Sequence, residues 1–311
     1  MSYHIEDTAR RKHPAAPRWP SFRGASQFVG TSPSGRVDVF VDPSLGSKAL
    51  KNAEELVKDS DRVVLANDSV FGTHGGHVSV IVFALGGETD GSGGADHLGC
   101  DYTTGAAIEV CAAYGRPARV SALFEAELSE CSMNGNLCGA STGEALSRWC
   151  AAAIGNNALA DFATAPEWAQ DGAPDFVNRT DPTDQNADST GCGMAFISWL
   201  ISQGFDLGRI APAMVALGDS GTLAQLYGVL TSEDPANAWP KFRTAILSLA
   251  NGVTSDDPFG AMASAMQDTD QVVARVRAGI PPLSDPMAAS ACQSGSRRLL
   301  PPGAAKRAGP R

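Results

Sequence analysis

Four side chains in the middle of the chain have the types that acid–base or metal-assisted chemistry requires. Three are the carboxylates Glu127, Glu130 and Glu144, and the fourth is His97. A carboxylate held away from bulk water can serve as a general base, and carboxylate and imidazole groups are common ligands of divalent metals. We therefore expect Glu127 to be the catalytic base of any active site, with His97, Glu130 and Glu144 as the metal ligands.

Glu127 is the carboxylate that the sequence pattern buries. Read with a helical period, residues 118–131 place an apolar stripe along one side of a helix, formed by Val120, Leu123, Phe124, Leu128 and Cys131. Glu127 falls inside this stripe, whereas Glu130 lies at its border and Glu125 lies off it, where solvent is expected. A buried carboxylate is costly without a partner, so Glu127 requires one, such as Arg119, Arg148 or backbone donors.

The segments around these carboxylates resemble the gluzincin-type zinc peptidases. In that family a helix carrying H-E-x-x-H precedes a second helix that opens with a phrase such as N-E-G-L-A, whose Glu is the third zinc ligand. The corresponding segments here are 126–130 (AELSE) and 143–147 (GEALS). The later segments 168–174 (WAQDGAP) and 197–200 (ISWL) are similar to the basic-secretory-protein branch, and the resemblance covers roughly residues 36–250.

The zinc-binding histidines of that motif are replaced by Ala126 and Glu130, and no histidine follows His97 in the chain. The resemblance therefore implies a zincin-like α+β fold with a degenerate motif and no metal, whose cleft binds a peptide or a protein partner. One alternative is an active metal-dependent hydrolase, in which one divalent ion, calcium better than zinc, is bound by the His and Glu ligands named above. A structural or assembly protein is the second alternative.

Simpler roles also fit several of these residues. Ser141 and Glu144 have the spacing of a helix capping box, and Glu144 and Arg148 have the spacing of an ion pair within one helix. Residues 139–143 (GASTG) match the nucleophile motif G-x-S-x-G, but no strand precedes them and no histidine follows, so a helix cap is favoured. A Cys–His dyad would have to use His74, His77 or His97.

The elements that must position these residues follow from periodicity and turn signals. We expect strands at 36–41 and 77–85 flanking a helix at 46–70, then two short strands within 97–111. Helices are expected at 118–131 and 141–154, around Cys192–Leu200, at 207–217, 220–231 and 235–249, and as two short pieces at 259–267 and 269–278. Segment 165–190 is expected to be mostly irregular.

The domain organisation follows from the same pattern. Residues 1–34 are predicted to be a flexible N-terminal segment. Residues 35–250 are predicted to form the zincin-like domain, with a sheet layer at 35–115 and a helical lobe at 116–250. Residues 251–311 are predicted to be weakly packed short helices and a disordered tail.

Composition limits the partners and the compartment. Acidic residues outnumber basic ones, 34 to 24, which argues against nonspecific binding to nucleic acid or to an anionic membrane. Residues 1–34 lack the apolar core of a signal peptide, so the cytoplasm is the default expectation, with secretion by another route left open. Among the seven cysteines, Cys131 and Cys138 bracket the link between the two central helices. They are expected either to form a disulfide or, like the others, to remain buried thiols.

Overall fold

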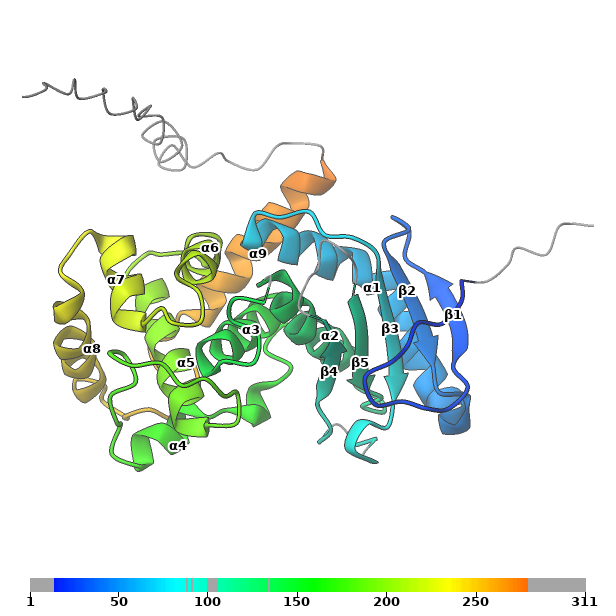
Figure 1. Cartoon of the computed structure of the whole chain (residues 1–311), viewed down its shortest axis with the longest axis horizontal. Helices are drawn as coiled ribbons and strands as arrows, with labels where there is room; N and C mark the ends of the chain where they lie inside the picture. Colours follow the sequence, from blue (N-terminus) through cyan, green and yellow to red (C-terminus); the bar gives the residue numbers. More distant parts are fainter. Residues whose placement is uncertain (1–13, 88, 91, 100–105, 134, 279–311) are drawn as a thin grey trace, which may run out of the picture.

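The computed structural model describes residues 14–87, 89–90, 92–99, 106–133 and 135–278, and Figure 1 shows them as a sheet layer beside a larger set of helices. The strands are β1 (Gln27–Thr31), β2 (Val37–Val41), β3 (Val78–Phe83), β4 (Ala95–Leu98) and β5 (Ala106–Cys111). The first helices are α1 (Gly46–Phe71), α2 (Pro117–Ser132), α3 (Ser141–Ile154) and α4 (Ala165–Gln170). They are followed by α5 (Ala187–Ser202), α6 (Leu207–Leu217), α7 (Leu223–Thr231), α8 (Ala238–Leu247) and α9 (Met262–Arg277). The predicted α+β class is confirmed.

The five strands form one mixed sheet in the order β1-β2-β3-β5-β4. Strands β2, β3 and β5 are parallel, while β1 and β4 run antiparallel to their neighbours at the two edges. Strands β2 and β3 consist mainly of valine and isoleucine, as is typical of strands that are covered on both faces. Edge strand β4 instead alternates, with Asp96 and Leu98 exposed and His97 turned toward the protein. This alternation decides which side chain of β4 can enter a site.

One face of the sheet is covered by α1 and α2, as Figure 1 shows, and α2 also packs against α3. Helix α2 therefore has protein on two sides, the sheet with α1 on one and α3 on the other. From α3 the core continues into α5, where the Trp149 indole N–H donates to the carbonyl oxygen of Met194 at 2.9 Å. The helices α4 to α8 extend away from the sheet around α5. The α2–α3 pair is thus the junction between the sheet layer and the helical part.

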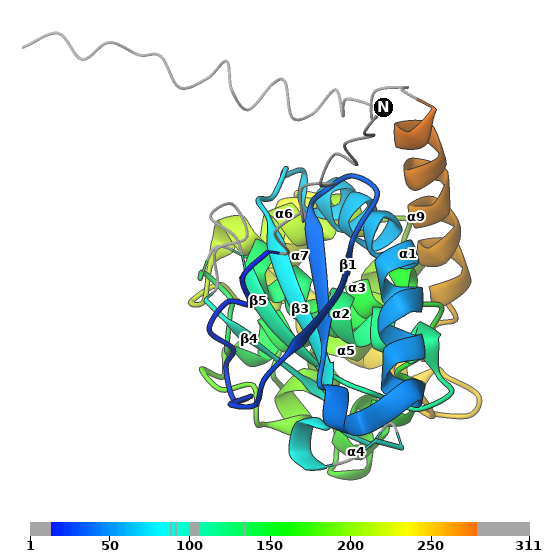
Figure 2. The same cartoon turned by 90° about the vertical axis from the view of Figure 1, so that its right-hand side faces the viewer.

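The opposite face of the sheet is covered by residues 14–26, which we call the N-terminal strap. Figure 2 shows this dark blue segment crossing the sheet. Trp19 of the strap packs edge-on against Phe40, and Phe22 packs against Phe83. We expected residues 1–34 to be flexible and the first ordered element to begin at Arg36. The prediction was wrong for the strap and for β1, because alternating apolar residues of the sheet need a cover on their second face.

The C-terminal part of the described chain also differs from expectation. One helix, α9, replaces the two short helices expected at 259–267 and 269–278, and it packs on α1 and α3. Its start is fixed by Asp257, whose carboxylate accepts the backbone N–H groups of Ala261 and Met262 at 2.8 Å. A hydroxyl hydrogen bond from Ser198 of α5 at 2.6 Å anchors the same carboxylate. This segment is therefore joined to the core instead of being weakly packed; the tail expected beyond it lies outside the described residues.

Secondary-structure boundaries agree closely with the sequence in the centre of the chain. Helices α2 and α3 begin and end within one residue of 118–131 and 141–154. The segment 165–190, expected to be irregular, contains the short helix α4. Among the described helices, none combines the length and the apolar composition that crossing a bilayer requires.

Candidate functional site

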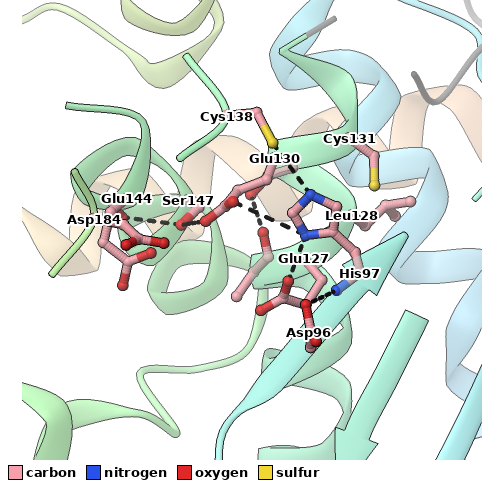
Figure 3. Close-up of polar contacts among 12 residues, drawn as sticks. Asp96, His97, Glu127, Leu128, Glu130, Cys131, Cys138, Glu144, Ser147 and Asp184 are labelled. Atoms are coloured by element: carbon pink, nitrogen blue, oxygen red, sulfur yellow. Dashed lines mark hydrogen bonds and ion pairs between the residues drawn. The ribbon is translucent and has the colours of Figure 1, made fainter. Parts of the chain in front are cut away.

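The candidate site lies where edge strand β4 passes the side of α2, and Figure 3 shows its side chains. His97 of β4 points at α2, and its Nδ1 lies 2.7 Å from the Oε2 atom of Glu127. The side chains of His97 and Glu127 are only 11% and 14% exposed, so the pair is largely removed from water. The partner that the sequence required for Glu127 is thus a histidine from the sheet, and not an arginine.

Glu130 lies one helical turn beyond Glu127 and is buried in the same site. Its Oε2 is 4.0 Å from His97 Nδ1, and its Oε1 accepts a hydrogen bond of 3.2 Å from the Ser147 hydroxyl of α3. The carboxyl group also shares a hydrogen bond with the side chain of Glu144. Glu130 of α2 therefore lies next to side chains of both α3 and β4.

Glu144 stands at the outer side of this cluster and pairs with Arg148. The distance from Arg148 Nε to Glu144 Oε1 is 2.8 Å, which confirms the ion pair expected within α3. The capping box expected from Ser141 and Glu144 does not form. Residue Ala140 caps α3 without a side-chain hydrogen bond, and the Ser141 hydroxyl turns instead to Ser189 Oγ at 2.5 Å. Because Ser141 is buried against α5, its hydroxyl bonds to Ser189 and does not cap the N-terminus of α3.

Burial and crowding of acidic groups set the protonation of this site. Burial, followed by the charges of Glu127 and Glu144, raises the pKa of Glu130 to about 9, so this carboxyl holds a proton at neutral pH. Burial also raises the pKa of Glu127, although its bond to His97 opposes the shift. For His97, burial by itself lowers the pKa, but the hydrogen bond and charge of Glu127, with Asp96 and Asp184, outweigh it and the pKa is raised.

Cys138, from the link between α2 and α3, also belongs to the site, although the sequence had suggested it only as a disulfide candidate. Its sulfur lies 3.2 Å from His97 Nε2, on the side of the ring opposite Glu127. The close approach of the link to α3 depends on Gly143, because a Cβ there would collide with the carbonyl oxygen of Leu137. The one available signal was position, since Cys138 directly precedes the helix that carries Glu144.

The cysteines of the described chain fall into two groups. Cys111, Cys131, Cys150 and Cys192 are fully buried thiols. Cys138 is partly exposed and disulfide-bonded, whereas Cys131 is a thiol. The bridge expected between Cys131 and Cys138 is therefore wrong, and the Cys131 thiol donates to the carbonyl oxygen of Gly99 at 3.4 Å instead. For the four buried residues the alternative expectation, that they act as small apolar side chains, is confirmed.

One group among the described residues has the donors and the spacing to hold a metal ion. It consists of His97, Glu130 and Cys138, whose ligand atoms all lie within 4.8 Å of one another. Glu144, the third ligand expected from the sequence, does not belong to this group. The imidazole, carboxylate and sulfur donors match those of zinc sites better than those of calcium sites, which use oxygen alone. As a disulfide sulfur, however, Cys138 lacks the negative charge of a thiolate ligand.

Glu125 is a second buried carboxyl on α2 and lies outside this cluster. We expected it to face solvent, but it is fully buried and neither of its carboxyl oxygens has a hydrogen-bond partner. Burial raises its pKa well above the ordinary value, which favours the uncharged form. The expectation failed because α2 is covered on two sides, and the pattern of a single apolar stripe revealed only one of them.

Other histidines and acidic side chains of the described chain have separate partners. His77 Nε2 lies 3.0 Å from Asp38 and His74 Nδ1 lies 3.3 Å from Asp68, so the two rings do not converge on one ion. The acidic side chains of segment 165–190 are used mainly in turns, as when Asp175 accepts the backbone N–H groups of Val177 and Asn178.

No family model, curated protein or solved structure matches this chain. The arguments for function therefore depend on its own residues.

Proposed function

We propose that this chain is a catalytically degenerate, zincin-like relative of the metallopeptidases that binds an extended peptide or protein segment along β4. The observation that carries this proposal is that protein groups satisfy every carboxylate of the site. Glu127 is bound by His97, Glu130 by the Ser147 hydroxyl and Glu144 by Arg148. A metallopeptidase needs its ligands deprotonated and facing an ion, whereas here Glu130 carries a proton at neutral pH.

The order of elements supports the zincin-like part of the proposal. The helix that carries Glu127 follows a parallel strand, β5, and lies behind an antiparallel edge strand, β4. The second helix, α3, places Glu144 beside the first. This is the arrangement that the resemblance to the gluzincin-type peptidases implies for the two helices and the substrate-binding edge.

The peptide-binding part of the proposal depends on β4. It ends the sheet in the described chain, so its outer backbone groups can pair with an added strand. Leu98, at its end, is one of three large apolar side chains that are exposed in the described residues. A strand added here would run beside α2 and the His97–Glu127 pair. An extended segment with an apolar side chain opposite Leu98 fits this edge best.

The proposal is tested first by metal analysis of protein purified without chelator, reductant or affinity tag. We expect no stoichiometric metal and a melting temperature that EDTA, zinc and calcium leave unchanged. About one tightly bound equivalent whose removal lowers the melting temperature would favour the second candidate, a metal-dependent hydrolase. The observation that favours a hydrolase is the distance of 4.0 Å between His97 Nδ1 and Glu130 Oε2, two of its expected metal ligands. If the protein is such a hydrolase, Glu127→Gln should abolish its turnover.

Binding at β4 is tested with a library of short random peptides, selected on the immobilised protein and then studied by NMR. Selected peptides should shift the backbone amides of β4 and should bind about tenfold more weakly to Leu98→Asp, because a charge would then face the added strand. Leu247→Asp on α8 is the matched control, since Leu247 is even more exposed and lies far from the sheet. Equal loss in both variants, or shifts confined to other elements, would contradict the proposal.

A further inference from the structure

Three side chains from three separate elements converge beside Glu127, and together they have the composition of a metal site. His97 comes from β4, Glu130 from α2 and Cys138 from the link before α3, as Figure 3 shows. One ligand atom of each lies within 4.8 Å of the others. Nitrogen, oxygen and sulfur donors at this spacing could share one tetrahedrally coordinated ion.

The orientation of the histidine ring is already that of a metal ligand. Its Nδ1 is engaged by Glu127 at 2.7 Å, which directs Nε2 toward Cys138 Sγ at 3.2 Å. A carboxylate on the far nitrogen is the common outer partner of a metal-binding histidine, because it fixes the ring and its tautomer and makes the near nitrogen more basic. In this arrangement Glu127 positions His97 and does not itself contact the ion.

The ability of the Cys138 sulfur to bind a metal depends on whether this cysteine is in a disulfide or is a thiolate. In the structure Cys138 is disulfide-bonded, and a disulfide sulfur is a poor ligand compared with a thiolate. Its side chain is partly exposed in a link whose neighbours Gly135, Asn136 and Gly139 are exposed, so a small thiol can reach the bond. The other cysteines of the described chain are already thiols, so a reductant leaves them unchanged.

We propose that opening the Cys138 disulfide creates a zinc site formed by His97 Nε2, the Glu130 carboxylate and the Cys138 thiolate, with a fourth position left for water. A dithiol reductant supplies the two electrons: it is oxidised to its cyclic disulfide while Cys138 and its partner become thiols. Binding of Zn²⁺ then displaces the thiol proton of Cys138, the carboxyl proton of Glu130 and any proton on His97 Nε2, and all of them pass to solvent. The thiolate and the Glu130 carboxylate together balance the two positive charges of the ion.

This inference is independent of peptide binding at β4, which concerns the oxidised protein and the backbone of the strand. It also differs from the ligand set expected from the sequence, because Cys138 replaces Glu144. The two sets make opposite predictions for Cys138→Ser and Glu144→Gln. The donor set further favours zinc over calcium, because thiolate is a soft ligand that calcium does not use.

The test compares the full-length protein in two states, oxidised and reduced with a dithiol that is then removed by anaerobic desalting. Each state is titrated with Zn²⁺ in competition with a chromophoric chelator. We expect the reduced protein to bind about one equivalent and the oxidised protein to bind it roughly 100-fold more weakly. Replacing zinc by Co²⁺ should give a thiolate-to-metal charge-transfer absorption in the reduced protein alone.

Variants identify the ligands. Cys138→Ser, His97→Gln and Glu130→Gln should each remove tight binding by the reduced protein, and Glu127→Gln should weaken it about 10- to 100-fold through the histidine. Glu144→Gln should retain binding, as should the control His77→Gln, whose ring contacts Asp38 elsewhere. Circular dichroism of every variant shows whether the fold is kept. Equal zinc affinity in the two states, or tight binding by reduced Cys138→Ser, would overturn the proposal.

Discussion

His97 and Glu127 join the edge of the sheet to the central helix of the molecule. The contact of 2.7 Å between His97 Nδ1 and Glu127 Oε2 is made by side chains that are both largely buried, and it spans 30 residues of sequence. Because the charge of each group is stabilised chiefly by the other, removing one leaves its partner buried and unpaired. Strand β4 is therefore held on α2 by an electrostatic contact as well as by its pairing with β5.

The protonation of His97 gives the first prediction. In an NMR titration the pKa of His97 should lie above the ordinary value of about 6.5, and Glu127→Gln should lower it by about one pH unit or more. A raised folded-state pKa means that the stabilisation is fully present below about pH 6.5 and is lost as pH rises through the folded value. Urea unfolding of wild type and His97→Gln across this range measures that loss.

His74→Gln provides the control for this titration, because the ring of His74 is exposed beside Asp68. Its removal should leave the titration of His97 unchanged. An His97 pKa that does not respond to Glu127→Gln would show that the pair does not form in solution.

Glu130 gives the second prediction, with the opposite dependence on pH from an ordinary ion-paired carboxylate. Its folded-state pKa of about 9 lies above its unfolded value, so the folded protein holds a proton that the unfolded chain releases. Stability must therefore fall as pH rises from about 4.5 toward 9. Glu130→Gln should raise the free energy of unfolding by up to roughly 5 kcal/mol at pH 8, about 1.4 kcal/mol for each pH unit above 4.5, and make little difference below pH 4.5.

The amide of Glu130→Gln can still accept the Ser147 hydrogen bond, which keeps this comparison close to one of charge alone. Glu55→Gln serves as the control, since it removes an exposed ion pair with Lys58 on α1 and should leave stability almost unchanged at every pH. Chemical denaturation at several pH values distinguishes the two. A stability difference for Glu130→Gln that is constant with pH would contradict the shifted pKa.

The sequence predicted the position of the site on the two central helices, but it did not predict the burial of Glu125 or the contact of Cys138 with His97. Helical periodicity placed Glu127 in a buried stripe, and helices α2 and α3 begin and end almost where expected. Periodicity describes one helix at a time, however, and α2 is covered on two sides, so the burial of Glu125 could not be deduced. Nor could the approach of Cys138 to His97, since it depends on a link with no regular period and on a strand 41 residues earlier in the chain.

The N-terminal strap shows the same limitation and gives the third prediction. Glu109 of β5 is fully buried on the strap side of the sheet, and its carboxylate accepts hydrogen bonds from the backbone N–H groups of Ser21 and Phe22 and from the Ser21 hydroxyl, at 2.6 to 3.0 Å. Charge-assisted bonds of this kind are strong. Glu109→Gln should therefore lower the free energy of unfolding by about 2 kcal/mol and speed amide hydrogen exchange at Ser21 and Phe22.

Ser21→Ala separates the contributions within the strap, because it removes the hydroxyl bond and leaves both backbone bonds. It should cost about 1 kcal/mol and leave the exchange of Phe22 nearly unchanged. Unaltered protection of both amides in Glu109→Gln would mean that the aromatic contacts of Trp19 and Phe22 hold the strap without the carboxylate.

Glu125 gives the last prediction, a substitution that should stabilise the protein. Both of its carboxyl oxygens are buried without a hydrogen-bond partner, and burial raises the pKa of the group well above its ordinary value. Glu125→Leu replaces it with an apolar side chain of similar size and should raise the free energy of unfolding by about 1–3 kcal/mol. Since burial raises the pKa of the folded carboxyl well above the unfolded value of about 4.5, the gain should increase as pH rises above 4.5.

Glu54→Leu on the exposed side of α1 is the matched control, and it should change stability by less than about 0.5 kcal/mol at any pH. Thermal and urea unfolding at pH 5 and pH 8 measure both variants. If Glu125→Leu proved destabilising, Glu125 would have to contribute a favourable interaction in the folded protein. In that case Arg62, whose charge already opposes the rise in its pKa, is the group to substitute next.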